Sequence, residues 1–253
     1  MRKIIDKVTI TGADNSVHPE DLLKLSDKYP FVEWGILLSK ASQGNNRFPD
    51  LDWLQECYKT WFIAGNSMTN FMLSGHICGT WVRHICEGQW TMFHDLPDVT
   101  DMFGRFQLNF HSYVHKLNQE KFLAGFDDPE LYYRQFIFQL DDVNNSILEV
   151  AKNSEIDAVG LFDLSGGLGV LPKDWPVSSG YCGYAGGLSP ENLQSQMELI
   201  DKVVGEGPIW IDVETHVRSN GDAQFDLDRV QKFLDVASDW VIEPIGKECH
   251  EYA

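Results

Sequence analysis

The sequence has few basic residues and no long apolar run. Its 253 residues include 20 Lys and Arg against 38 Asp and Glu, which gives a formal net charge of −18 at pH 7. Such a field repels nucleic-acid phosphates, so no nucleic-acid partner is expected. No stretch approaches the roughly 18 apolar residues of a membrane helix, and the opening MRKIIDKVTI has no apolar signal core. We therefore expect a cytoplasmic protein that has no membrane partner.

The sequence also lacks paired Cys-x-x-Cys spacings and any compact metal-ligand motif. The cysteines are scattered and odd in number, at Cys57, Cys78, Cys86, Cys182 and Cys249. This pattern favours free thiols in a reducing compartment over a disulfide framework or a zinc site. We expect neither a metal nor an organic cofactor, and these features set no oligomeric state.

Short apolar, β-branched runs alternate with amphipathic helical patterns along the chain, without a linker or an internal repeat. This alternation is typical of parallel βαβ units. The expected strands are Val8–Thr11, Val32–Leu38, Asn70–Leu73, Phe106–Phe110, Gln135–Leu140, Ala158–Phe162, Tyr181–Ala185 and Ile209–Val213. The expected helices are Glu20–Lys28, Leu51–Ala64, Gly79–Gly88, Ser112–Ala124, Val143–Asn153, Pro190–Val204 and Leu227–Val236. Eight strands in a chain of this length predict an α/β fold, a single (β/α)8 TIM barrel that forms one domain over residues 1–253.

Two connections depart from the regular pattern. Gly166–Pro176 is too rich in glycine and proline for a helix, and Trp90–Val99 is an insertion-like segment that serves either as a lid or as packing, with packing favoured.

Polar residues gather where the predicted strands end, which is where barrel enzymes place their active sites. They are Thr11, Asp14, Ser39, Lys40, Ser74, His76, Asn109, His111, Asp141, Asp163, Gly186, Gly187, Glu214 and His216. Asp163 is the first candidate for acid–base catalysis, because a carboxyl group in a partly dry mouth can have a raised pKa. Its alternative role is to cap the loop at Gly166. Glu214, Asp14 and His76 are candidates for the opposite proton-transfer role, although Glu214 could instead pair with Arg218 and His76 could cap a helix.

Two consecutive late loops are rich in glycine. Gly166, Gly167 and Gly169 follow the sixth predicted strand, and Gly186 and Gly187 follow the seventh, just before Ser189-Pro190-Glu191. Glycines let the main chain approach a ligand and direct N–H groups toward phosphate oxygens. Because barrel phosphate sites form in these late loops, we expect a phosphorylated small molecule as the partner.

These same residues carry a resemblance to a known family. Asp157–Asp163, the following Gly166-Gly167-Leu168-Gly169, and Ala185–Asn192 resemble the sixth- and seventh-strand segments of phosphoribosylanthranilate isomerases. The resemblance implies a ribulose-phosphate-binding TIM barrel in which Asp163 matches the general acid and Arg47 matches the arginine that meets a substrate carboxylate. It is strongest over the last 100 or so residues.

Two positions differ from the family pattern. Thr11 stands where the resemblance implies a cysteine general base, and Glu214-Thr215-His216 replaces a small Ser-Ser-Gly turn. A threonine hydroxyl is too weak a base near neutral pH without a strong activator. The sequence therefore indicates divergent chemistry at a related site.

Three functions follow from these observations. The leading hypothesis is cofactor-free acid–base isomerisation of a phosphorylated, ribose-derived compound, with Arg47, His111 and Asp212 contacting the substrate. The second is a catalytically inactive barrel that binds a phosphorylated sugar or nucleotide. The third is a metal-dependent hydrolase or lyase that uses imidazole and carboxylate groups from separate strands, such as His76, His111, Asp163 and His216.

Overall fold

Eight parallel strands close into a barrel in the computed structural model, which describes residues 2–66, 70–109, 117–140, 145–163, 165, 168–178 and 180–243. Each strand pairs with the next in sequence, and β8 pairs with β1 to close the ring. The strands are β1 (Ile5–Thr11), β2 (Val32–Leu38), β3 (Met72–Ile77), β4 (Arg105–Leu108), β5 (Gln135–Leu140), β6 (Ala158–Phe162), β7 (Cys182–Ala185) and β8 (Ile209–Val213). This topology confirms the predicted TIM barrel.

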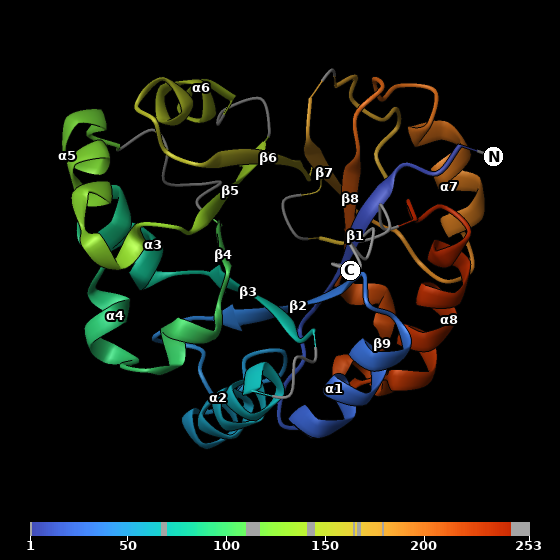
Figure 1. Cartoon of the computed structure of the whole chain (residues 1–253), viewed down its shortest axis with the longest axis horizontal. Helices are drawn as coiled ribbons and strands as arrows, with labels where there is room; N and C mark the ends of the chain where they lie inside the picture. Colours follow the sequence, from blue (N-terminus) through green and yellow to red (C-terminus); the bar gives the residue numbers. More distant parts are fainter. Residues whose placement is uncertain are drawn as a thin grey trace, which may run out of the picture.

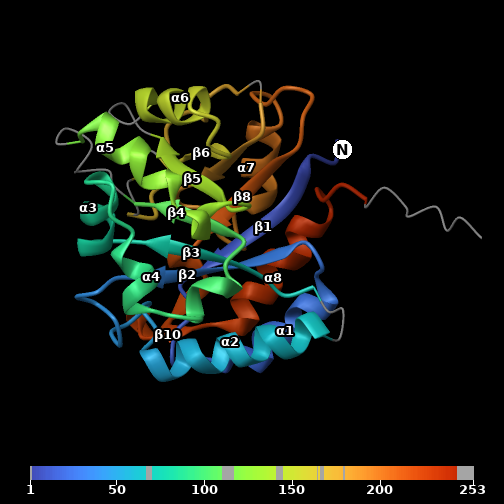
Figure 2. The ribbon, with the colours of Figure 1, turned by 60° about the vertical axis from the view of Figure 1, so that its left-hand side comes forward.

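Helices surround the ring of strands (Figure 1). They are α1 (Pro19–Lys28), α2 (Leu51–Asn66), α3 (Thr80–Cys86), α4 (Thr91–Asp95), α5 (Gln119–Ala124), α6 (Asn145–Asn153), α7 (Leu193–Ile200) and α8 (Leu227–Ser238). α1 and α2 pack against each other on the outside of the barrel (Figure 2). A short antiparallel pair, β9 (Arg218–Ser219) and β10 (Gln224–Phe225), follows β8.

The prediction for the third strand was wrong. We expected Asn70–Leu73, whereas the strand is Met72–Ile77 and pairs through Ile77 with Leu108 of β4. We placed Ser74 and His76 after this strand, but both lie within it, and the alternation of side chains along the strand turns them toward the barrel interior. α7 is shorter than the expected helix Pro190–Val204. A turn precedes it, in which Ser189 and Asn192 exchange hydrogen bonds of 2.9 and 3.3 Å.

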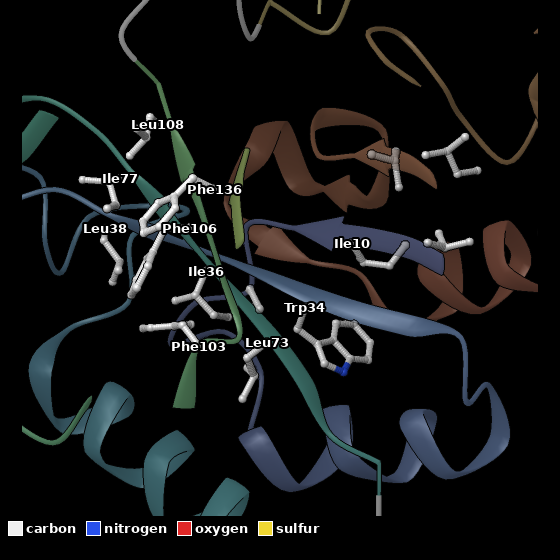
Figure 3. Packing of buried hydrophobic residues seen from close by; sticks show 14 of the residues in the cluster. Ile10, Trp34, Ile36, Leu38, Leu73, Ile77, Phe103, Phe106, Leu108 and Phe136 are labelled. Atoms are coloured by element: carbon white, nitrogen blue, oxygen red, sulfur yellow. The ribbon is translucent and has the colours of Figure 1, made fainter. Parts of the chain in front are cut away.

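The main core lies between the strands and the helices. Outward-facing strand residues such as Ile36, Leu73 and Phe106 pack there (Figure 3). Trp90 joins this core through ring contacts with Phe106 and Phe136. The inserted segment around Trp90 is therefore packing, as favoured from the sequence, and among the described residues 168–176 no helix occurs.

The inside of the barrel has two different halves. An apolar cluster of Ile137, Val159, Leu161, Ala185 and Trp210 fills the side formed by β5 to β8. The side formed by β1 to β4 carries polar groups, and Glu33 on β2 forms a buried ion pair there with Arg105 on β4. The interior therefore contains charge even well below the mouth of the barrel.

The described chain contains no helix that is both long enough and apolar enough to cross a membrane. Its cysteines at positions 57, 78, 86 and 182 are free thiols, while Cys249 lies outside the described residues.

Candidate active site

A cavity of about 250 Å³ opens at the carboxyl ends of β3 to β8. The predicted residues in its lining are Asn109, Asp163, Gly169, Gly186, Gly187, Asp212, Glu214 and His216. Further polar lining residues are Cys78, Gln107, Gln139, Ser165 and Thr215. The location is the one expected for a barrel active site.

Asp212 at the end of β8 is the most perturbed acid of this cavity. Its side chain is buried, and Thr11 Oγ1 donates a 2.7 Å hydrogen bond to its Oδ1. Burial holds the pKa of Asp212 well above its usual range, the Thr11 hydroxyl lowers it, and the charges of Glu214 and Asp163 raise it further. Asp212 thus keeps its proton to a higher pH than an ordinary aspartate, and Thr11 orients it.

Removing the Thr11 hydroxyl should make Asp212 still harder to ionise. In Thr11→Val the ionised form loses a charge-assisted hydrogen bond, an interaction worth about 1.5–3 kcal/mol. We expect the carbon-13 NMR titration of the Asp212 carboxyl, assigned with Asp212→Asn, to move to higher pH. Thr11→Ser keeps the hydroxyl and is the control. An unchanged titration in Thr11→Val would show that Thr11 does not act on Asp212.

Asp163, directly after β6, faces the same cavity. Its Oδ1 accepts hydrogen bonds from the main-chain N–H and the hydroxyl of Ser165, and its Oδ2 accepts one of 2.8 Å from Gln139. The capping role that we weighed for Asp163 is therefore present through Ser165. Asp163 nevertheless lines the cavity, and 8% of its surface is exposed. Asp163 is held in position and remains within reach of a ligand.

Glu214 and Arg47 form an ion pair at the rim. Burial raises the pKa of Glu214, and the charge of Arg47 opposes this shift. Arg47 Nε also lies 2.8 Å from Asp222 Oδ2, and Arg47 is not among the cavity-lining residues. The carboxylates of Glu214 and Asp222 thus already bind the Arg47 guanidinium, which we expected to bind a substrate carboxylate. Glu214 pairs with Arg47 in place of Arg218.

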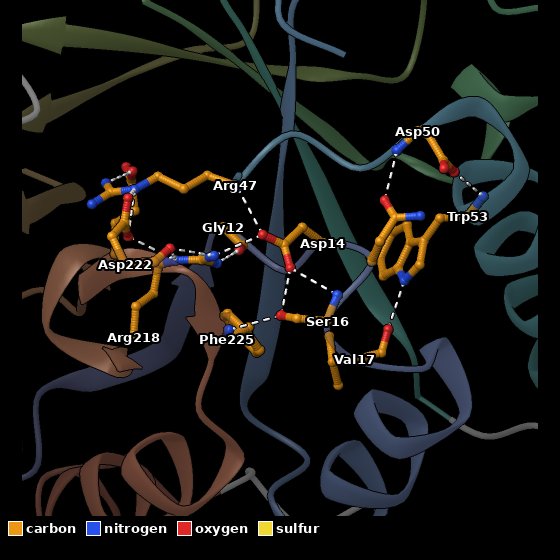
Figure 4. A network of polar contacts seen from close by, with 12 residues as sticks. Gly12, Asp14, Ser16, Val17, Arg47, Asp50, Trp53, Arg218, Asp222 and Phe225 are labelled. Atoms are coloured by element: carbon orange, nitrogen blue, oxygen red, sulfur yellow. Dashed lines mark hydrogen bonds and ion pairs between the residues drawn. The ribbon is translucent and has the colours of Figure 1, made fainter. Parts of the chain in front are cut away.

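Asp14 lies in a separate network beside the barrel mouth (Figure 4). It accepts hydrogen bonds from Ser16, from the main-chain N–H of Arg47, and from Arg218 Nη2 at 2.7 Å. Burial raises the pKa of Asp14, but these donors outweigh it and lower the pKa overall. The network binds the loops after β1, β2 and β8 together, and Asp14 is not in the cavity lining. We therefore leave Asp14 out of the proposed chemistry.

His76 lies inside β3, in contrast to our expectation that it follows the strand. It is 1% exposed, and its Nε2 is 3.2 Å from Ser74 Oγ. Burial lowers the pKa of His76 to about 4, with Arg105 lowering it and Glu33 raising it. A Cβ on Gly35 would lie 2.3 Å from Thr11 Oγ1 and 2.9 Å from the His76 ring, so only glycine leaves room for both. His76 supports the site from below and does not line the cavity.

The buried His76 should make the protein less stable in acid. Its pKa is about 4 in the fold against 6.5 in a model peptide, so the unfolded chain takes up this proton first as the pH falls. The contribution of the neutral, buried His76 to stability is complete above pH 6.5 and is lost as the pH falls toward 4. We expect His76→Gln to remove up to about 3 kcal/mol of this loss, measured by urea unfolding between pH 7 and pH 4. If the free energy of unfolding changed with pH in the same way in both proteins, the lowered pKa of His76 would be contradicted.

The late loops meet at one wall of the cavity. A Cβ on Gly187, whose φ is +68°, would lie 2.3 Å from the main-chain nitrogen of Leu171. Glycine at 187 is thus required by contact with the protein's own loop, whether or not a phosphate binds. His216 Nε2 donates a 2.9 Å hydrogen bond to the Gly169 carbonyl and ties the loop after β8 to the loop after β6. Gly166 and Gly167, like His111, lie outside the described residues.

Sequence reasoning named Asn109 but missed the other two amides of the site, Gln107 and Gln139. Gln139 comes from the inward-facing positions of β5, and Gln107 from those of β4. The signal was available, because polar residues at every second position of an otherwise apolar strand face the barrel interior. Among the residues that the structure describes, no group of three or more His, Cys, Asp or Glu is arranged to hold a metal ion.

No protein-family model matches the chain, and no curated protein sequence matches it. Similar solved structures exist. Phosphoribosyl anthranilate isomerase from Thermotoga maritima has a TM-score of 0.55 and 16% identity, over 93% of this chain and all of that one (100%). The enzyme from Thermus thermophilus has a TM-score of 0.52 and 13% identity, over 92% and 98% of the two chains.

A third structure is a phosphoribosyl anthranilate isomerase in complex with reduced 1-(o-carboxyphenylamino)-1-deoxyribulose 5-phosphate. Its TM-score is 0.54 and its identity 16%, over 93% of this chain and 100% of that one. At these identities the likeness establishes the barrel fold, and it agrees with the resemblance found in the sequence.

Proposed function

We propose that this protein is an acid–base enzyme that moves a proton on a phosphorylated, ribose-derived small molecule. The observation that carries the proposal is the placement of Asp163 and Asp212 in one cavity. They follow β6 and end β8, and the small Ala185, which pairs in register with Asp212, stands on the strand between them. Two carboxyl groups that line one cavity suit proton transfer to and from a bound ligand.

The surroundings of the two groups suggest their roles. Burial and the neighbouring carboxylates hold the pKa of Asp212 well above its usual range, which favours Asp212 as the proton donor. Asp163, oriented by Ser165 and Gln139, is the partner that accepts one, which reverses the acid role that the resemblance implies for it. Thr11, which is no base, acts by orienting Asp212.

We place the phosphate group of the ligand at the wall that contains Gly169, Gly186 and Gly187. Main-chain N–H groups at such glycines bind phosphate oxygens without a cationic side chain. Gly186 and Gly187 both have positive φ values, of 110° and 68°. A similar barrel was crystallised with a deoxyribulose 5-phosphate compound, which supports the same ligand class here.

Aldose–ketose isomerisation is the simplest reaction for this pair. Asp163 removes the proton from the carbon beside the carbonyl, and Asp212 gives its proton to the carbonyl oxygen, which forms an enediol. The reverse transfers at the neighbouring carbon and oxygen complete the reaction, so no atom is gained or lost. Isomerisation of this kind uses no redox equivalent.

The test is solvent deuterium exchange. The protein is incubated in D2O with ribose 5-phosphate, ribulose 5-phosphate or another pentose phosphate, and proton NMR follows the carbon-bound hydrogen beside the carbonyl. We expect exchange that depends on the protein. A second candidate, the catalytically inactive binding barrel, is favoured by Thr11 at the end of β1, and it predicts that each ligand binds and returns without deuterium. That result with every pentose phosphate would overturn the enzymatic proposal.

A further inference from the structure

The cavity has a wall of carboxamide side chains from β4 and β5, on the strands that precede those of its glycine loops. Gln107 lies on β4, Asn109 follows that strand, and Gln139 lies on β5. Gln107 Nε2 donates a 2.9 Å hydrogen bond to Asn109 Oδ1, and Asn109 Nδ2 lies 3.1 Å from Cys78 Sγ. These contacts fix the planes of the two amides, and each amide has two N–H donors and an acceptor oxygen with two lone pairs. The wall is therefore a fixed set of neutral donors and acceptors.

The same cavity is poorly suited to an aromatic acid. Its described lining contains no Lys or Arg, and it contains no Phe, Tyr or Trp. Arg47 is engaged by Glu214 and Asp222 at the rim. Asp163 stands directly beside Gln139, so a second anionic group at the amide wall would meet a carboxylate. Among the described lining residues an aryl carboxylate finds no Lys or Arg, and the His216 ring there already donates to the Gly169 carbonyl.

We propose that the amide wall binds hydroxyl groups, so that the organic part of the ligand is a polyhydroxylated chain and not an aryl carboxylate. A hydroxyl group both donates and accepts hydrogen bonds, as a carboxamide does, and the two form pairs without any charge. The amides also make the site selective, because a ligand without hydroxyls displaces water from them without forming hydrogen bonds in its place. The inference rests on the proposed function for the placement of the phosphate at the glycine loops.

The experiment measures binding of inert probes by isothermal titration calorimetry. Ribitol 5-phosphate presents a hydroxylated chain and a phosphate, pentyl phosphate lacks the hydroxyls, and ribitol lacks the phosphate. Reduced 1-(o-carboxyphenylamino)-1-deoxyribulose 5-phosphate adds the aryl carboxylate. We expect ribitol 5-phosphate to bind at least tenfold more tightly than pentyl phosphate and than the aryl compound.

Variants then locate the hydroxyl contacts. Gln107→Leu and Asn109→Ala should each weaken ribitol 5-phosphate about tenfold and leave pentyl phosphate unchanged. Gln55→Leu, on an exposed position of α2, makes the same chemical change outside the cavity and should change neither affinity. The second wall variant keeps the test valid if the first fails to fold, which thermal unfolding would show.

The outcomes separate this inference from the proposed function. If ribitol binds as tightly as ribitol 5-phosphate and both wall variants weaken it, the hydroxyl wall stands and the phosphate part of the proposed function fails. If pentyl phosphate binds as tightly as ribitol 5-phosphate, or the aryl compound binds more tightly, the hydroxyl wall is overturned and the phosphate stands. If no probe binds, both are overturned.

Discussion

Replacing Asp163 with Asn is expected to reduce turnover of the pentose phosphate substrate about 10²–10⁴-fold, the usual contribution of a positioned acid or base. The amide keeps the size of the carboxyl group and an oxygen that still accepts from Ser165, so the fold should be preserved. It loses the ability to take a proton. The loss should therefore fall on kcat, with KM changed little.

Asp212→Asn should give a loss of the same order for the complementary reason, because Asn has no proton to release to the carbonyl oxygen. The two losses should not add in the double variant, since both groups act on one proton-transfer sequence. Asp226→Asn, a change at the N-cap of α8, is the matched control for folding and should leave kcat unchanged. Full activity in either site variant would remove that residue from the mechanism.

Breaking the ion pair inside the barrel is expected to destabilise the protein by about 3–5 kcal/mol, the usual cost of leaving one buried charge without its partner. Arg105 Nε lies 2.9 Å from Glu33 Oε1, and the two side chains are only 7% and 4% exposed. Burial raises the pKa of Glu33, but the charge and hydrogen bonds of Arg105 more than reverse this shift. Arg105 also lies over the Trp210 ring at 4.8 Å, so its removal leaves a space beside an otherwise packed side chain.

The variants Glu33→Gln, Arg105→Met and the double change form a cycle that is measured by urea unfolding at pH 7. The double variant should cost clearly less than the sum of the single variants, because it leaves no unpaired charge. Exactly additive losses would show that the pair is not coupled. Lys24→Met, which removes one partner of the exposed Lys24–Asp21 pair on α1, is the control and should change stability by less than about 1 kcal/mol.

Some residues of the site could be placed from the sequence around them, and others could not. Asp163, Gly186 and Gly187 follow strands that are clear in the sequence, so their place at the mouth could be predicted. His76 was misplaced because Ser74-Gly75-His76 has the composition of a turn. Its strand character depends on pairing with β2 and β4, a tertiary contact that local propensity does not contain.

Arg47 and Asp14 show a second reason for failure. Both are charged residues in loops after strands, which is the pattern of a binding site. Their partners Asp222 and Arg218 are more than 170 residues away in sequence, so the ion pairs that engage them depend on closure of the barrel between β8 and β1. A charged loop residue is available to a ligand only if no such partner reaches it.

The sequence by itself determined that this chain forms a TIM barrel, and it determined the two late glycine loops. The periodicity of a strand and the position of a glycine can both be read from a short window of sequence. Only the tertiary structure decided which ionisable groups meet in the cavity. It brings Thr11 to Asp212 across 201 positions, places Asp163 and a wall of amides at the same mouth, and engages Arg47 and Asp14 elsewhere. Shifts of pKa follow from burial and from neighbouring charges, and both are set by which strands lie side by side.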